Sequence, residues 1–178
     1  SAITRRLPDA ILTSSGRAAA LLRDDFAVPP ERIHALPDCA DPTHFDPARF
    51  PFEPADHPLR TQYGIPREAV VVGYLGLLTD YQGVPHLIEA AARLKAAGQP
   101  IHFLVMGYPN VESYQMSAHA WDVADRVTFT GRVPFDDAPY DLAAADIAVT
   151  AKMSTTEGSG KLLNYMAMAQ PIVAYDTP

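Results

Sequence analysis

The second half of the chain alternates between apolar runs and segments in which apolar residues recur at helical spacing. Val70–Leu75 carries no charged residue, as is typical of a strand buried on both faces. A helical stripe follows and ends at Gly98, and Asp136 or Asp137 is expected to cap a short helix through Ala144. Further strands are predicted at residues 101–106, 127–130, 147–150 and 171–175. This alternation predicts an α/β fold with a doubly wound, mostly parallel, Rossmann-like sheet.

The first 66 residues follow a different pattern. Residues 1–36 hold two short strand patterns around a helix pattern, for which Ser15 is a candidate N-cap. Residues 37–66 are rich in proline, which excludes helix interiors and central strands. This segment is either a meandering surface loop or is ordered by packing of Phe45, Phe50 and Phe52. We predict three regions: the incomplete end of an N-terminal domain (1–36), an interdomain linker (37–66) and a second domain truncated at its C-terminus (67–178).

Composition and charge narrow the classes of function. The net charge is −7 without a run of like charges, so nucleic acid, which needs a basic stripe, is not an expected partner. The single cysteine, Cys39, leaves no internal disulfide and fits a reducing compartment. No apolar stretch is long enough to span a bilayer and no signal peptide begins the sequence, so we expect a cytoplasmic location. The six histidines lack ligand spacing, and no metal site is predicted.

Glycines follow several of the predicted strands. Gly76, Gly107 and Gly131 each come at a strand end, and the strand at 147–150 leads into a turn at 154–160. Parallel strands end at one edge of a sheet, so these turns are expected to lie together, where glycine lets a ligand approach the backbone. The helix after the last turn would offer free N–H groups to a phosphate, with three polar side chains nearby: Glu157, Lys161 and Asn164. Taken alone, such a turn is more often a surface loop before a well-capped helix.

An ordered series of motifs resembles a known family. The series is Gly76 with Gln82 and Gly83, then FLVMG (103–107), VTFTGRV (127–133), YDLAAADIAV (140–149), Glu157-Gly158 and YMAMAQPIVA (165–174). From residue 70 onwards it resembles the C-terminal, donor-binding half of family 4 glycosyltransferases (glycosyl transferases group 1), which have the GT-B fold. Residues 10–15 and 32–47 resemble the last strand of that family's N-terminal acceptor domain and the linker after it.

The resemblance implies a function and a set of roles. It implies a hexosyltransferase-type enzyme that transfers a sugar from a nucleoside diphosphate sugar with retention, using no metal ion or other cofactor. It implies that Glu157 contacts hydroxyls of the donor sugar and that Asn164 stands where a glutamate holds the ribose. The remaining implied donor-binding residues are Gly76, Gln82, Gly83, Gly107, Gly131, Arg132, Val133, Gly158, Ser159 and Gly160; of these, Arg132 and Val133 flank the base.

The sequence departs from the family pattern where the diphosphate is usually held. The usual arginine and lysine fall on Leu77 and Gln82, and Asn164 follows Glu157 at seven residues where the family has two glutamates eight apart. We predict that Lys161 supplies one missing positive charge, with Lys152 or Arg132 as a second. Glu157 and Lys161 are therefore the predicted catalytic residues.

Other functions stay open. The departures favour a degenerate, non-catalytic GT-B-like module for binding or assembly, and an epimerase of the same architecture fits the N-terminal segment less well. For the transferase, the expected partners are a nucleotide-sugar donor and an unidentified acceptor (a glycan, a lipid or a small molecule). Peripheral association of the full-length protein with the inner face of the membrane is also compatible with this function. The chain alone is expected to be inactive, because the acceptor-binding half is missing.

Overall fold

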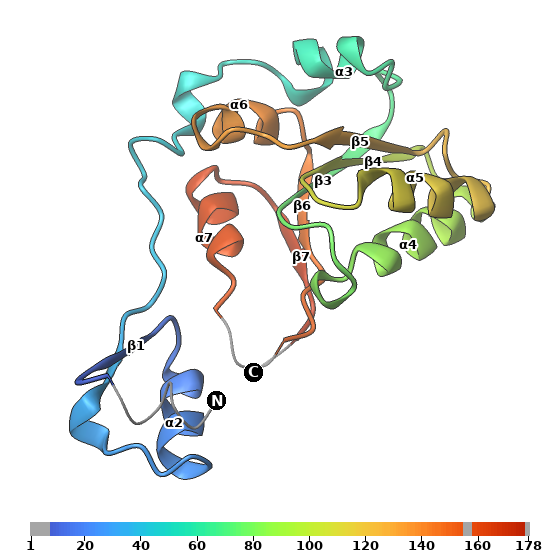
Figure 1. Ribbon diagram of the computed structural model, residues 1–178. Helices are drawn as coiled ribbons and strands as arrows, with labels where there is room; N and C mark the ends of the chain where they lie inside the picture. Colours follow the sequence, from blue (N-terminus) through green and yellow to red (C-terminus); the bar gives the residue numbers. More distant parts are fainter. Residues whose placement is uncertain (1–7, 155–157, 177–178) are drawn as a thin grey trace.

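The computed structural model describes residues 8–154 and 158–176, which form a large α/β unit and a small N-terminal unit (Figure 1). The large unit contains a five-stranded sheet in the order β5-β4-β3-β6-β7. Its strands are β3 (Val70–Leu75), β4 (Ile101–Met106), β5 (Val127–Gly131), β6 (Ile147–Thr150) and β7 (Ile172–Ala174). All four neighbouring pairs are parallel, which confirms the predicted fold class.

Helices cover both faces of this sheet. Helices α4 and α5 pack on one face in an apolar core that includes Val72 and Phe103, and α6 and α7 belong to the opposite core with Val71 and Leu104. Val71 and Val72 belong to different cores because successive residues of a strand point to opposite faces. The elements are η4 (Asp80–Gln82), α4 (Val84–Ala96), α5 (Val111–Ala120), η5 (Phe135–Asp137), α6 (Ala138–Leu142) and α7 (Gly160–Ala167). None of the helices in the described ranges has the length and apolar composition that a membrane crossing needs.

The strand order places a topological switch point beside β3. From β3 the chain proceeds outward to β4 and β5, and then returns to add β6 on the other side of β3. Val72 of β3 therefore lies opposite both Phe103 of β4 and Ile147 of β6. Ligands of open α/β sheets bind beyond the carboxyl ends of the strands at such a point. The segments that follow β3 and β6 are thus the first place to look for a site.

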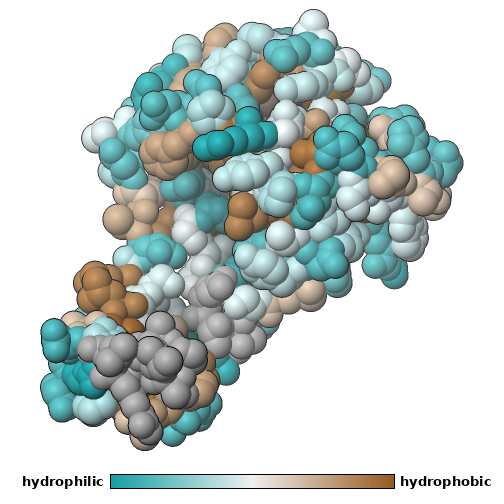
Figure 2. All heavy atoms as spheres, viewed as in Figure 1, coloured by the Kyte–Doolittle hydropathy of each residue, from teal (hydrophilic) through white to brown (hydrophobic). Residues whose placement is uncertain are grey.

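The small unit is a two-stranded parallel sheet with one helix. It consists of β1 (Ile11–Thr13), α2 (Gly16–Asp24), η1 (Pro30–Arg32) and β2 (Ile33–Ala35). The predicted N-cap is confirmed, because Ser15 Oγ accepts a hydrogen bond from the N–H of Ala18 at 3.1 Å. Two strands and one helix cannot enclose a core. Leu12 and Leu36 are accordingly 64% and 57% exposed, and apolar surface is visible on this unit in Figure 2.

The proline-rich segment is ordered and contains more helix than its composition indicates. It forms η2 (Pro47–Arg49), η3 (Pro54–Asp56) and the short α-helix α3 (Pro58–Gln62). This agrees with the prediction that proline excludes helix interiors, because Pro58 occupies the first position of α3, where the missing N–H is not needed. Phe45 is 1% exposed in the core beside α6 and α7, and Phe50 packs against it, so the packing interpretation holds. Phe52 remains 44% exposed.

The helix before β6 begins without the predicted cap. Asp137 precedes α6 but has helical dihedral angles (φ −89°, ψ −15°), and its side chain accepts no capping hydrogen bond. The reason is that the 3-10 turn η5 runs directly into α6, so no extended residue separates them. The helix also ends at Leu142, two residues before the predicted end at Ala144.

A buried arginine joins the proline-rich segment to the sheet. Arg60 of α3 is 2% exposed. Its guanidinium donates to the carbonyl oxygens of Ala144 and Ala69 at 2.8 and 3.2 Å, and to Asp146 Oδ2 at 2.7 Å. The same carboxylate oxygen accepts the N–H of Val71 at 2.7 Å. One side chain thus ties α3 to the first residues of β3 and to the turn before β6.

Acid should destabilise the fold through His102, a buried residue of β4. Burial, and then the positive charge of Arg126, lowers the pKa of His102 from 6.5 to about 4. The unfolded chain therefore takes up the proton first as the pH falls, so this contribution to stability is intact above pH 6.5 and is lost between 6.5 and 4. We expect this contribution to be about 1–2 kcal/mol in urea unfolding. His102→Gln should lose that much less stability in acid, while it keeps the loss caused by His57, whose pKa burial also lowers to about 4.

The control for this effect is His119→Gln, which changes an exposed histidine of α5. That variant should keep the acid-induced loss of the unmodified chain. Identical pH profiles for His102→Gln and the unmodified chain would show that His102 does not cause the loss.

Candidate functional site

The glycines that follow the strands lie together at the carboxyl edge of the sheet. The N–H of Gly76 donates to the carbonyl of Met106 at 2.9 Å, and the N–H of Gly107 donates to the carbonyl of Gly131 at 2.8 Å. A Cβ placed on Gly107 would overlap the carbonyl oxygen of Gly76, so the turns after β3 and β4 touch backbone to backbone. Gly83, with φ +82°, meets the carbonyl of Ala151 after β6 in the same way. The structure thus gathers four of the predicted glycines at the carboxyl edge of the sheet.

Lys161 reaches this edge from the first turn of α7. Its Nζ donates to Gln82 Oε1 at 2.7 Å and to the Tyr74 hydroxyl at 3.1 Å. The ammonium also lies 4.4 Å from the centroid of the Tyr74 ring, within cation–π range. A Cβ on Gly76 would come within 2.7 Å of Lys161 Nζ, so glycine is what allows this approach. The lysine therefore occupies the turn between β3 and α4, where the family's basic residues are expected.

The partners of Lys161 among the described residues are neutral. Burial raises the pKa of the Tyr74 phenol, which donates its own proton to the carbonyl of Leu77 at 2.7 Å. No carboxylate within residues 8–154 and 158–176 forms an ion pair with Lys161. Burial, with a smaller effect from nearby Lys152, lowers the pKa of the Lys161 ammonium to about 8. The site thus holds a desolvated cation that an anion would stabilise.

The turn Gly158–Gly160, named here the glycine turn, is tied to the end of β6. Lys152 is 7% exposed, and its Nζ donates to the carbonyl oxygen of Gly158 at 2.7 Å. The hydroxyl groups of Thr150 and Ser159 lie 3.4 Å apart. These contacts hold the glycine turn beside the sheet edge at the start of α7, whose N-terminus carries the positive end of the helix dipole.

The other predicted site residues are placed less closely together. Glu157 lies outside the described residues. Asn164 is half-buried on α7, about one helical turn beyond Lys161. Arg132 is exposed, and its guanidinium lies 5.2 Å from the centroid of the Tyr108 ring. Val133 packs against the core beside α6 and α7. Arg132 therefore pairs with an aromatic residue between the turns after β4 and β5.

Two residues near the site were not identified from the sequence. Tyr74 lies near the end of β3, and a tyrosine inside an otherwise aliphatic run was a usable signal. Asp38 follows β2 in the chain, yet its carboxylate Oδ2 lies 2.7 Å from the position of a Cβ on Gly158. Nothing in the local sequence around Asp38 indicates this contact, because it joins two units that are far apart in the chain.

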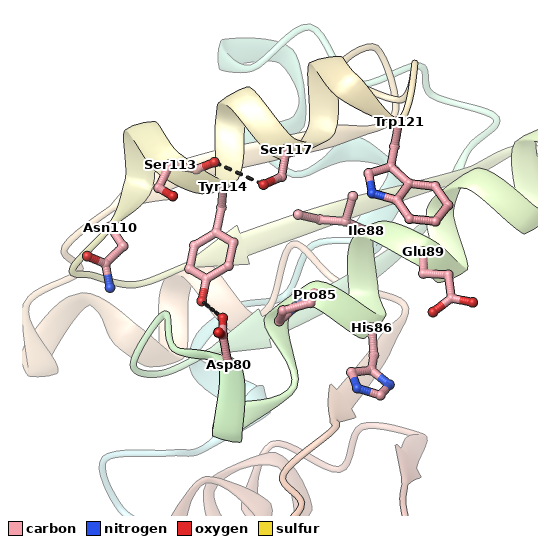
Figure 3. A pocket seen from close by; sticks show the side chains of 10 residues that line it. All are labelled: Asp80, Pro85, His86, Ile88, Glu89, Asn110, Ser113, Tyr114, Ser117 and Trp121. Atoms are coloured by element: carbon pink, nitrogen blue, oxygen red, sulfur yellow. Dashed lines mark hydrogen bonds between the residues drawn. The ribbon is translucent and has the colours of Figure 1, made fainter.

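A pocket of about 400 Å³ between α4 and α5 is separate from these residues (Figure 3). Tyr114 donates to Asp80 Oδ1 at 2.8 Å across it, and Trp121 borders its far end. Its lining includes none of the glycines or basic residues predicted for the donor. The basic side chains and glycine-containing turns described above lie at the carboxyl edge of the sheet, away from this pocket.

The fold is that of one half of a GT-B glycosyltransferase. Anabaena Alr3699/HepE, solved in complex with UDP-glucose, superposes with a TM-score of 0.79 at 18% identity, over 98% of this chain and 47% of that one. WaaG, a glycosyltransferase involved in lipopolysaccharide biosynthesis, superposes with a TM-score of 0.77 at 21% identity, over 92% of this chain and 43% of that one. At these identities the likeness establishes the fold.

Sequence comparison establishes the family. Residues 69–178, more than half of the chain, match the family described as glycosyl transferases group 1. The chain belongs to this family. It is 29% identical over 167 residues to the 2-deoxystreptamine glucosyltransferase of Streptomyces kanamyceticus. The matched residues make up 93% of this chain and 42% of that protein. The chain thus spans less than half the length of this relative.

Proposed function

We propose that this chain is the donor-binding part of a glycosyltransferase that takes a hexose from a nucleoside diphosphate sugar and transfers it with retention to an acceptor. The observation that carries the proposal is Lys161, an ammonium held by neutral partners between the Gly76 turn and the start of α7. Support also comes from Alr3699/HepE, which shares the fold and was solved with UDP-glucose. Relatives named as glucosyl- and mannosyltransferases favour a hexose.

The residues present fit a diphosphate. In this proposal Lys161 gives up its bonds to Gln82 and Tyr74 and pairs with phosphate oxygens, which restores the charge missing at Leu77 and Gln82. The N–H groups at the start of α7 and in the glycine turn add dipolar stabilisation. As the sugar leaves, negative charge grows on the diphosphate, and fixed groups aimed at that charge lower the barrier. This arrangement supplies positive charge from the chain itself, so we propose that no metal ion is needed.

The remaining roles follow the same arrangement. We propose that Glu157 contacts hydroxyls of the donor sugar and that Asn164 hydrogen-bonds the ribose, as an amide can both donate and accept. Gly107, Gly131, Arg132 and Val133 would border the nucleoside beyond β4 and β5. Tyr108, whose ring faces Arg132, is 45% exposed at the same edge.

Thermal shift with UDP-, GDP- and ADP-sugars tests donor binding directly. One of these ligands at a hundred times its dissociation constant should stabilise the chain by about 2.7 kcal/mol. The shift should be unchanged by EDTA, since no metal is proposed. If no nucleotide shifts the transition, the second candidate is favoured: a GT-B-like module without catalysis. Leu77, Gln82 and Asn164 are the residues that favour it.

We propose that sugar transfer needs the full-length protein and not this chain alone. The chain covers 42% of the Streptomyces kanamyceticus relative, so we expect the 178-residue chain to bind a donor and to transfer no sugar. The acceptor is proposed to be a glycan, a lipid or a small molecule in the cytoplasm or at the inner face of the membrane. Nuclear magnetic resonance of the product anomer, made by the full-length protein, tests retention.

Donor affinity should fall in alkaline solution. The pKa of Lys161 is about 8 in the ligand-free chain, so the ammonium that would pair with the diphosphate is lost as the pH rises past that value. We expect the dissociation constant to be nearly constant from pH 7 to 7.5 and to rise above pH 8, by at most about tenfold per unit. Calorimetric titration at pH 7, 8 and 9 measures this. A flat profile in the unmodified chain would contradict a charge role for Lys161.

A further inference from the structure

The carboxylate of Asp38, in the segment that follows the small unit, lies against the glycine turn. Asp38 follows β2, and its Oδ2 lies 2.7 Å from the position of a Cβ on Gly158 and 3.4 Å from that of a Cβ on Gly160. The carbonyl oxygen of Ser14, after β1, lies 3.3 Å from the same position at Gly158. The two units approach this closely because residues 158 and 160 have no side chains.

This contact brings a negative charge to the place where the proposed donor would put its sugar and phosphates. Lys152 and Lys161 supply positive charge at the same turn. A carboxylate accepts hydrogen bonds from hydroxyl groups but repels phosphate oxygens. Asp38 therefore distinguishes two kinds of neighbour: a hydroxylated sugar, which it can bind, and a bare terminal phosphate, which it disfavours.

We propose that Asp38 is a specificity-determining residue of the donor site, which favours a nucleoside diphosphate sugar over the free nucleoside diphosphate. This inference rests on the proposed function. In transfer, the bond between the anomeric carbon and the diphosphate oxygen breaks and leaves its electron pair on the diphosphate. The acceptor hydroxyl forms the new bond to the sugar, and its proton passes by way of the departing diphosphate to water. The product carries more negative charge than the donor beside Asp38, so the carboxylate promotes its release.

Calorimetric titration of Asp38→Asn with UDP and UDP-glucose tests this. GDP and GDP-mannose replace them if the thermal-shift panel shows guanine binding. The variant should bind the free diphosphate about five- to tenfold more tightly, because one repulsion is removed. Its affinity for the nucleotide sugar should change less than about twofold, because the lost repulsion is offset by a weaker hydrogen bond to the sugar. The gain for the free diphosphate should shrink in 1 M salt.

Glu31→Gln is the matched control, since it removes one negative charge from an exposed residue of the neighbouring small unit. It should leave the ratio of the two affinities unchanged. Asp38→Ser is a second variant that removes the same charge, and circular dichroism checks the fold of both.

The outcomes separate this inference from the proposed function. Equal binding of the free diphosphate by Asp38→Asn and the unmodified chain would overturn the role of Asp38 while leaving donor binding intact. If Asp38→Asn bound both ligands more tightly by the same factor, Asp38 would repel both alike, and the claim of specificity would be overturned. Absence of binding by every variant and by the unmodified chain would refute the proposed function and this inference with it.

Discussion

Lys161→Met should weaken the binding of a nucleoside diphosphate by about 1.5–3 kcal/mol, the range of a hydrogen bond to a charged group. The unmodified ammonium sits between the Gly76 turn and α7 without a carboxylate partner in the described ranges, so it is poised to pair with phosphate. Methionine keeps much of the length and apolar contact of lysine and removes the charge. Isothermal titration calorimetry at pH 7 measures the difference. Unchanged affinity would refute the role of Lys161.

The same variant should become more stable, by on the order of 1 kcal/mol at pH 7. Burial that lowers the pKa of Lys161 from 10.5 to about 8 is a cost to the folded chain. The cost is fully present below pH 8 and fades as the pH rises towards 10.5, where the unfolded chain also loses the proton. Affinity and stability should therefore move in opposite directions. Lys95→Met, which removes a charge paired with Asp122 and Asp125 on the surface, is the control and should not weaken nucleotide binding.

Arg60→Met should destabilise the fold by about 3 kcal/mol in urea unfolding, because it removes the cation that pairs with Asp146 and the donor to two carbonyl groups in a largely buried position. The guanidinium makes all three bonds from a side chain that is 2% exposed. The loss should appear mainly as a lower midpoint with an unchanged slope.

The control for Arg60 is Arg67→Met. Arg67 pairs with Asp56, but the two side chains are 69% and 50% exposed. An exposed pair contributes about 0–1 kcal/mol, so this variant should unfold close to the unmodified chain. An equal loss of unfolding free energy in the two variants would mean that the buried bonds of Arg60 stabilise the fold no more than an exposed ion pair does.

The sheet was predictable from the sequence because its central strands are continuous apolar runs. Val70–Leu75 and Ile101–Met106 are strands over the predicted residues, since a strand buried on both faces is apolar along most of its length. The meeting of Gly76, Gly107 and Gly131 also followed from parallel topology. In both cases a local pattern and the sheet geometry lead to the same answer.

Other features depend on contacts between distant segments. α3 is held in place by the bonds of Arg60 to the residue before β3 and to the turn before β6, and a count of prolines does not contain that information. The contact of Lys161 with the Gly76 turn could not be predicted from local sequence, because it depends on the path of the side chain across the sheet edge. Asp38 reaches the glycine turn only through the relative position of the two units. The roles of Glu157 and Asn164 stay predictions.

The burial of Phe45 limits where the two units can rotate against each other. Phe45 is 1% exposed in a core of the large unit, and the ring of His44 stacks on Phe135 at 4.9 Å between centroids. The chain from His44 onwards must therefore travel with the sheet. Any opening or closing of one unit over the other has to take place in the few residues between β2 and Thr43. Asp38 belongs to that pivot, so even a modest swing would change its distance from α7.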